Sequence, residues 1–545
     1  MRAKFKFVYL LLLFSVYLNT SLQAEIKSTA YSSSKNISLK KWEVLDIAFK
    51  AKSKSPFTTD FHAIFTSPSG KEQKVAGFYN GNKEWLLRFS GAEVGKWTFK
   101  TSSPVKALNN KKGALNISNE IAEAKKGGIV IPKEDPQHFY YEDGTPYFLM
   151  AFECDWLYAL DYHNEEALPK TDHLLNLVKD NGMNQVVMNV FSYDVHWKWG
   201  KDPLLKEHPE HEFGGPKDIF PFLGNNDNPD FSALNVDFFK KLDRTIDLMN
   251  EKEIISHLMI YVWNKDVNWP EMNTEADNMY YDYIVKRYGA FPNIMWDVSK
   301  EALFYGRADD EYILERINRL RKANWFNRLV TVHDYKFCQR NAKDVDYISR
   351  QDWTHLLYRN MLDDHNKYTD KPVFNIEHGG YEESSYVVFS GSYISAEACL
   401  RRNYECLFAG VYSTYYWQGT SWNAIIWNPF EQDDSFYKPK FEYFKHMTAL
   451  MSEYEFSNFE PDPTHNQAGF CLKEKNKENY LYYVPKETYW YRTEFLFKRT
   501  KKPITCKWFN TLTGEYSKEF VITKKQHFIS PWYNKADAIL IHTVE

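Results

Sequence analysis

The sequence of 545 residues predicts an α/β protein in which a (β/α)8 TIM barrel lies between an N-terminal and a C-terminal β-sandwich. Three observations lead to this fold class. Short alternating strands fill residues 25–122, and similar strands return over residues 453–545. Between them, over residues 123–452, candidate strands alternate with helices. That alternation is typical of a barrel of parallel strands wrapped in helices.

The first 24 residues have the pattern of a signal peptide. Arg2, Lys4 and Lys6 form a positive region, an apolar stretch follows from Phe7 to Leu18, and Ala24 is a small residue suited to cleavage. The apolar stretch is too short to span a bilayer, and no later run of 18 apolar residues occurs. We therefore expect an exported protein, periplasmic or extracellular, without membrane insertion.

Composition narrows the function classes further. A formal net charge of −4 without a long basic run gives no reason to expect a nucleic-acid partner. Aromatic residues make up 17% of the chain, which suits a large core and also flat rings that stack on sugars. The 6 cysteines are sparse and predict isolated buried thiols rather than a disulfide framework. The sequence contains no signal for the oligomeric state.

The N-terminal region predicts short strands with alternating apolar residues, separated by Gly- and Pro-containing turns, as in a β-sandwich. These strands are expected at Glu43 to Ala51, Phe61 to Phe65, Glu84 to Phe89 and Gly95 to Thr101. A polar stretch ending in Gly127 and Gly128 is expected to link this domain to the next.

The central region predicts eight strands separated by helices or long loops, as the barrel requires. The strands are expected at Tyr147 to Phe152, Gln185 to Phe191, Ile254 to Tyr261, Asn293 to Val298, Leu329 to His333, Tyr347 to Arg350, Val373 to Glu377 and Gly410 to Trp417. Helices are expected at Asp172 to Asp180, Asn235 to Asn250, Glu275 to Tyr288, Asp310 to Ala323 and Ala396 to Phe408. A doubly wound open sheet is the alternative, but no Gly-rich phosphate-binding turn follows the first strand.

After Tyr454 the pattern returns to strands, which predicts a second, smaller β-sandwich. Its strands are expected at Gly469 to Leu472, Asn479 to Val484, Glu494 to Phe497, Ile504 to Phe509 and Ala538 to His542.

Two glutamates follow apolar strands of the predicted barrel. Glu377 closes one strand directly before Gly379 and Gly380, and Glu301 lies just past another. In a closed barrel, the ends of the fourth and seventh strands face the same mouth. A pair of carboxylates there can cleave a glycosidic bond, one as proton donor and the other as nucleophile. Glu301 could instead begin a helix, and Glu377 could form a surface ion pair.

Polar and aromatic side chains follow the other predicted strands and could surround a bound sugar. Each of them could equally be a packing residue. The substrate-binding candidates are Trp417, His333, Asp352, Trp353, His378, Lys300, Asn189, Trp263, Trp422 and Gln418. Glu153, Asp155 and Gln351 lie at similar strand ends.

Three segments carry a resemblance to a known family: Tyr288 to Glu301, Lys371 to Glu382 and Ala396 to Asn423. In these segments the chain resembles the apiosidase-like (β/α)8-barrel glycoside hydrolases with an N-terminal β-sandwich, which belong to a retaining clan. The resemblance implies that Glu301 is the acid/base, that Glu377 is the nucleophile and that Trp417 stacks on the sugar. It also implies a substrate from a plant or algal polysaccharide or a derived oligosaccharide.

One residue departs from the family pattern. Such enzymes commonly have Asn before the acid/base glutamate, whereas this chain has Lys300 before Glu301. A neighbouring lysine favours an ionised carboxylate and so lowers the pKa of an acid. Lys300 could point away, it could meet an anionic sugar substituent, or the activity could be lost.

Other chemistries have weaker support in the sequence. His196, His208 and His211 share one long loop but lack metal-ligand spacing, so neither a metal nor another cofactor is expected. No G-x-S-x-G elbow of a serine hydrolase occurs. The two rival functions are a non-catalytic carbohydrate-binding protein on a degenerate barrel and a polysaccharide lyase.

Overall fold

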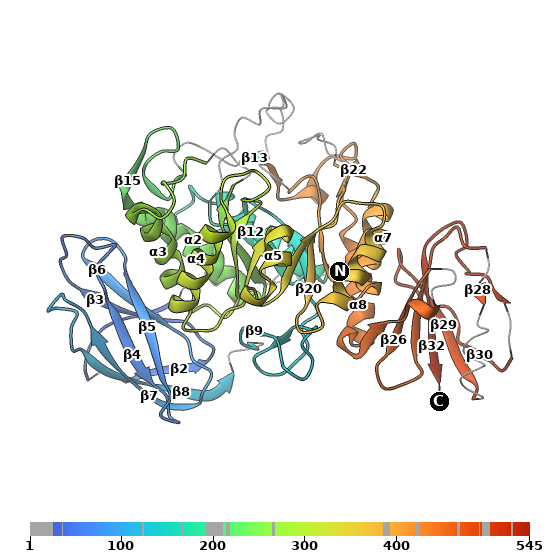
Figure 1. The fold of residues 1–545 in the computed structure, drawn as a ribbon, viewed down its shortest axis with the longest axis horizontal. Helices are drawn as coiled ribbons and strands as arrows, with labels where there is room; N and C mark the ends of the chain where they lie inside the picture. The colour runs from blue at the N-terminus through green and yellow to red at the C-terminus, as the bar shows by residue number, and fades with distance from the viewer. Residues whose placement is uncertain are drawn as a thin grey trace, which may run out of the picture.

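The computed structural model describes residues 26–34, 36–121, 125–165, 167–191, 211–213, 219–263, 267–384, 393–420, 424–465, 469–489, 491–492, 502–524 and 527–544. Three parts follow one another along its longest axis (Figure 1). The N-terminal sheet lies on one side of a central barrel, and the C-terminal sheet lies on the other. The predicted fold class, a (β/α)8 barrel flanked by two β domains, is confirmed.

The N-terminal part is an eight-stranded sheet in the order β1-β3-β6-β5-β4-β7-β8-β2. The sheet closes over an apolar core in which Phe65 stacks on Phe89 with ring centroids 4.3 Å apart. The strands are β1 (Lys27–Ala30), β2 (Ile37–Lys41), β3 (Leu45–Lys50), β4 (His62–Thr66), β5 (Glu72–Tyr79), β6 (Glu84–Phe89), β7 (Gly95–Ser102) and β8 (Lys112–Ile121). A short ribbon of β9 (Ile129–Val130) and β10 (Tyr140–Tyr141) follows.

The barrel is a sheet of eight parallel strands in the order β18-β17-β16-β12-β11-β23-β20-β19. The gap between β18 and β19 is bridged by the Thr331 hydroxyl, which donates to the Tyr347 carbonyl at 2.8 Å, and by the Asp346 amide, which donates to the Val330 carbonyl at 2.8 Å. The alternative of an open, doubly wound sheet is therefore wrong. The strands are β11 (Met150–Glu153), β12 (Gln185–Asn189), β16 (Ile255–Val262), β17 (Ile294–Lys300), β18 (Val330–His333), β19 (Ile348–Gln351), β20 (Val373–Glu377) and β23 (Tyr412–Tyr415).

In the described part of the chain, eight α-helices connect or cover these strands, and local sequence signals start several of them. Side chains of Thr274, Asp309 and Ser395 accept hydrogen bonds from main-chain amides of the first turns of α3, α4 and α7. The helices are α1 (Pro169–Asp180), α2 (Val236–Glu251), α3 (Glu275–Tyr288), α4 (Asp310–Ala323), α5 (Tyr335–Arg340), α6 (Leu357–Lys367), α7 (Ala396–Phe408) and α8 (Phe441–Glu453). Because helices cover its outside, a strand such as β16 is buried along its whole length.

Short two-stranded ribbons extend the loops of the barrel. They pair β13 (His211–Phe213) with β24 (Ala424–Ile426), β14 (Phe222–Gly224) with β15 (Pro229–Leu234), and β21 (Tyr381–Glu382) with β22 (Tyr393–Ile394). In Figure 1, β13, β15 and β22 lie at the upper end of the barrel, and β9 lies at the lower end.

The C-terminal part is a six-stranded antiparallel sheet in the order β25-β26-β27-β32-β29-β30 with an adjoining ribbon of β28 and β31. Phe528 of the ribbon packs into the same apolar cluster as Leu540 of the sheet. The strands are β25 (Phe459–Pro461), β26 (Phe470–Glu474), β27 (Tyr480–Val484), β28 (Tyr491–Arg492), β29 (Ile504–Asn510), β30 (Phe520–Ile522), β31 (His527–Phe528) and β32 (Ala538–Val544). The strand expected at Glu494 to Phe497 lies outside the described residues.

A buried ion network joins the N-terminal sheet to the barrel. Arg88 of β6 donates to both Asp46 of β3 at 2.8 Å and Asp243 of α2 at 3.0 Å. Arg287 of α3 donates to the other oxygen of Asp243 at 2.8 Å. Burial alone would raise the pKa of Asp243, but Arg287 and Arg88 lower it, so the network is held as charged pairs.

Two further sequence predictions concern the cysteines and the membrane. All six cysteines are free and buried, as predicted. Within the described residues, none of the helices combines the length and the apolar character that a bilayer crossing requires.

Candidate functional site

Glu301 lies at the end of β17, where the strand becomes irregular. The register with β18 shifts between Asp297 and Lys300, and Glu301 itself has a left-handed backbone with φ of 57°. Its amide still donates to the His333 carbonyl at 2.9 Å. A bulge of this kind redirects side chains that would otherwise alternate between the two faces of a strand. Glu301 begins no helix, so the alternative of a helix-start carboxylate is wrong.

Glu377 ends β20, and one amide connects it to Glu301. Gln351, at the end of β19, donates from Nε2 to Glu377 Oε2 at 2.7 Å and to Glu301 Oε1 at 3.1 Å. The sum of these bonds, 5.8 Å, is an upper limit for the separation of the two oxygen atoms. Glu377 and Glu301 are only 4% and 9% exposed, so this pair is sheltered from water and is not a surface ion pair.

Lys300 points into the site. Its ammonium lies 3.1 Å from Glu377 Oε1, 3.5 Å from Glu153 Oε1 and 3.9 Å from Asp155 Oδ2. Burial disfavours its charge, but Asp155, Glu377 and Glu153 outweigh burial and raise the pKa of Lys300 well above its ordinary value. The ammonium is therefore charged at every physiological pH.

His333, at the end of β18, also approaches the nucleophile candidate. Its Nε2 lies 3.5 Å from Glu377 Oε1, and its amide donates to Asp297. Burial and the charge of Lys300 lower the pKa of His333 well below its ordinary value. The imidazole is therefore neutral and can donate or accept a hydrogen bond.

Three predicted residues present buried polar atoms without a hydrogen-bond partner among the described residues. They are the amide group of Asn189 at the end of β12, the indole N–H of Trp263 after β16, and the amide group of Gln418 after β23. Leaving such groups unpaired costs about 1–3 kcal/mol each. Hydroxyl groups of a bound sugar would satisfy them.

Three other predicted residues already make contacts with groups of the protein itself. The carboxylate of Asp352 accepts hydrogen bonds from Thr354, Arg350 and Asn360. His378 is fully buried, and its Nε2 lies 2.8 Å from the Thr414 carbonyl. Trp353 is 37% exposed and meets Tyr381 edge to face. Their sugar-binding roles remain predictions.

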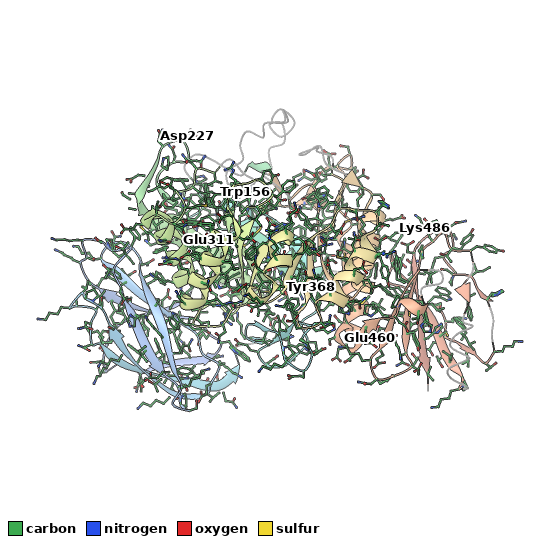
Figure 2. The ribbon with its side chains drawn as sticks, viewed as in Figure 1. Trp156, Asp227, Glu311, Tyr368, Glu460 and Lys486 are labelled. Carbon is green, nitrogen blue, oxygen red and sulfur yellow. The ribbon has the colours of Figure 1, made fainter. Side chains whose placement is uncertain are left out.

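The stacking candidate Trp417 is fully buried after β23, where Phe436 and Phe441 meet its ring edge to face. Trp422 lies outside the described residues. Another indole, that of Trp156 after β11, lies in the upper part of the barrel in Figure 2. The part that Trp417 plays in sugar stacking remains a prediction.

Sequence reasoning placed several central residues at the mouth without giving them roles. Gln351 joins the two glutamates, and Glu153 and Asp155 surround Lys300. Each lies at the end of a barrel strand or within two residues of it, which is the signal that could have identified them. Glu382 of β21 was missed altogether as a site-supporting carboxylate.

Glu382 anchors the loops on the β20 and β23 side of the site. It is fully buried and accepts hydrogen bonds from the hydroxyls of Tyr415 and Tyr437 and from the Lys440 amide. Its main-chain amide donates to the Tyr416 carbonyl, and its carbonyl accepts from Gln418. Burial raises the pKa of Glu382 to about 7.

This raised pKa makes the stability of the protein depend on pH. Because the folded-state pKa lies above the unfolded value, Glu382 contributes stability that is full below about pH 4.5 and is lost as the pH rises through about 7. The variant Glu382→Gln should therefore lose less stability than wild type between pH 5 and pH 8, by on the order of 1–3 kcal/mol. Thermal unfolding of both proteins, with Glu519→Gln as an exposed control, measures this difference. Equal pH slopes for wild type and Glu382→Gln would contradict it.

Within the described residues, no group of three or more His, Cys, Asp or Glu side chains is arranged to hold a metal ion. The groups that the site does present to a ligand are the paired carboxylates, the ammonium of Lys300 and the amide of Gln351.

Comparisons with known proteins identify the family to which the barrel belongs. The class of protein that the barrel and its paired carboxylates define is the glycoside hydrolase. Residues 133–458 match the family model described as Apiosidase-like, catalytic domain, and the chain belongs to this family. Residues 38–104 match a second model, described as a domain of unknown function (DUF5060). None of the curated proteins matches the chain in sequence.

Similar structures have been solved. A protein from Bacteroides vulgatus ATCC 8482, described as a candidate glycoside hydrolase, aligns with a TM-score of 0.72 at 18% identity, over 93% of this chain and 100% of that one. This similarity shows the same fold and extends over the flanking domains as well as the barrel. A Glycoside Hydrolase Family 5 mannosidase from Rhizomucor miehei aligns with a TM-score of 0.43 at 14% identity, over 61% of this chain and 99% of that one.

Proposed function

We propose that this protein is a retaining glycoside hydrolase that cleaves a glycosidic bond in a plant or algal polysaccharide or in an oligosaccharide derived from one. The observation that carries the proposal is the bridge of Gln351 between Glu301 and Glu377, which limits two of their oxygen atoms to a separation of 5.8 Å. Retaining enzymes place their carboxyl groups roughly 5–5.5 Å apart, whereas inverting enzymes leave about 6.5–9.5 Å for a water molecule.

The surroundings support distinct roles for the two glutamates. Glu377 lies against the Lys300 ammonium and the Gln351 amide, which both stabilise an ionised carboxylate. It would attack the anomeric carbon while the bond to the leaving oxygen breaks and Glu301 gives that oxygen a proton. Glu301 would then take a proton from water, and this water would displace Glu377 from the sugar.

Two rival functions give different results in the same assay. A carbohydrate-binding protein would bind glycans without releasing product, and a lyase would form an unsaturated uronate, detected by its ultraviolet absorbance. A lyase needs a Tyr or His base at the site. Burial, Glu153 and Glu377 raise the pKa of Tyr381 well above its ordinary value, which opposes a role as a base.

The stereochemistry of the first product tests the proposal. Wild-type protein is incubated with a panel of plant and algal polysaccharides and their oligosaccharides, and the anomer first released is followed by NMR. We expect hydrolysis with retained configuration. Release of the inverted anomer would exclude the covalent mechanism, and binding without release would favour the carbohydrate-binding rival.

We further propose that the protein acts outside the cytoplasm. The positive and apolar N-terminal pattern over residues 1–24 supports export, as does the size of polysaccharides, which do not cross membranes. The N-terminus of the mature protein, recovered from periplasm or medium, should follow Ala24. A retained Met1 in the exported fraction would contradict this proposal.

A further inference from the structure

We propose that Lys300 is a positioning residue, the counter-ion of the nucleophile Glu377, and that the catalytic subsite takes a sugar without an anionic substituent. The inference rests on the proposed function, because it assigns a role within the same site. It also decides between the interpretations of Lys300 that the sequence leaves open.

Carboxylates of the protein surround the ammonium of Lys300. An ammonium has three N–H donors, and three carboxylates surround that of Lys300 at 3.1, 3.5 and 3.9 Å. The Lys300 side chain is only 4% exposed. An acidic group of a sugar would have to displace Glu377, Glu153 or Asp155 to reach the ammonium.

Main-chain pairing on both sides of β17 fixes the orientation of Lys300 in the sheet. Lys300 pairs with Val262 of β16 and with His333 of β18, and its carbonyl accepts a hydrogen bond from the Trp263 amide. The shift in register that precedes Lys300 lies on the β18 side. Because β17 is bonded on both sides at this point, the main chain fixes the direction in which the Lys300 side chain leaves the strand.

The cluster around Lys300 holds more carboxylates than cations. One ammonium faces the carboxylates of Asp155, Glu377, Glu153 and Glu301, of which Glu301 has the weakest influence on it. A uronate or sulfate in this buried place would add another negative charge near four carboxylates. Hydroxyl groups, by contrast, donate hydrogen bonds to carboxylates. A neutral sugar therefore fits the site better than an acidic one.

The two catalytic carboxyl groups differ in their contacts with Lys300. Lys300 forms its ion pairs with Glu377, Glu153 and Asp155, while Glu301 is reached through the amide of Gln351. A cation that acts more strongly on Glu377 than on Glu301 favours an ionised nucleophile. Lys300 thus need not abolish the activity.

The test compares wild type, Lys300→Met and Lys300→Gln on matched pairs of 4-nitrophenyl glycosides, each pair a neutral sugar and the uronide of the same ring. We expect wild type to hydrolyse a neutral glycoside at least about 100-fold faster than its uronide. Both variants should lose about 10²-fold or more in kcat, and the acidic limb of kcat/KM should move up by about 1–3 pH units. The other titratable groups facing this cluster are Glu153, Asp155, Glu301, His333 and Tyr381.

Several outcomes would overturn the inference. One is hydrolysis of the uronide as fast as the neutral glycoside; another is a loss in the variants confined to the uronide, as expected if Lys300 bound an anionic substituent. An unchanged acidic limb would show that Lys300 has a merely structural role. Glu377→Gln separates the two proposals: if it keeps wild-type activity, the proposed function fails, and if only Lys300→Met behaves unexpectedly, the Lys300 inference fails.

A second measurement does not depend on turnover. Removing Lys300 leaves the carboxylates of Glu377, Glu153 and Asp155 without their buried cation, which disfavours their ionised forms, so the loss of stability grows as the pH rises. The unfolding temperature of Lys300→Met should therefore fall further below wild type at pH 8 than at pH 5. Lys371, a buried lysine whose ammonium donates to the carbonyls of Ala342 and Val345, provides the matched control, and Lys371→Met should show equal deficits. Equal deficits for Lys300→Met would also overturn the inference.

Discussion

Replacing Glu377 by glutamine is expected to lower kcat by a factor of about 10³ or more on every substrate that the wild type hydrolyses. The amide has the same shape but cannot attack the anomeric carbon. The new amide has one carbonyl oxygen, which can replace only one of the two Glu377 oxygens that meet Gln351 and Lys300, so a modest loss of stability is expected besides the loss of activity. Steady-state rates and thermal unfolding of the purified variant measure the two effects separately.

The loss of activity in Glu301→Gln should depend on the leaving group of the substrate. Loss of the proton donor costs about 10²–10⁴-fold on a natural glycoside, and much less on a 2,4-dinitrophenyl glycoside, whose leaving group needs no proton. Azide should restore activity to the alanine variants of both glutamates. The glycosyl azide formed by Glu301→Ala should have retained configuration, and the one formed by Glu377→Ala should have inverted configuration. Glu311→Gln, on α4, is the exposed carboxylate control (Figure 2). Activity of Glu377→Gln within tenfold of wild type would show that Glu377 is not the nucleophile.

The largest effect on stability is expected at Arg88. Its guanidinium is bonded to Asp46 and Asp243, and it lies over the rings of Phe78 and Phe291, all at the junction of the N-terminal sheet and the barrel. The variant Arg88→Met leaves both carboxylates buried without this partner. Removing one member of such a network costs about 3–5 kcal/mol.

Urea unfolding followed by fluorescence measures this loss, and a separate early transition would show that the N-terminal domain detaches first. The control is Arg359→Met, because Arg359 is 78% exposed and its pair with Asp363 is long, at 3.9 Å. Exposed pairs of this kind contribute about 0–1 kcal/mol. A loss below about 1 kcal/mol for Arg88→Met would contradict the stabilising role of the network.

The sequence by itself determined the elements whose signals are local. Helices α3, α4 and α7 have the predicted bounds because Thr274, Asp309 and Ser395 cap their first turns. Strand β20 ends at Glu377 as predicted, since an apolar run gives way there to a polar turn with two glycines. In contrast, β5 went unpredicted because its Glu72–Tyr79 segment shows little alternation.

The tertiary structure alone decided how the site works. Nothing near Lys300 in sequence shows that Glu153 and Asp155 approach it, because β11 and β17 are brought together only by the curvature of the closed barrel. The bridge by Gln351 depends on shifts of register at the ends of β17 and β19. Local hydrogen bonds and side-chain spacing set each element and place both glutamates at strand ends. Barrel closure and strand register then set which charges meet, and this decides whether a lysine beside an acid prevents catalysis or supports it.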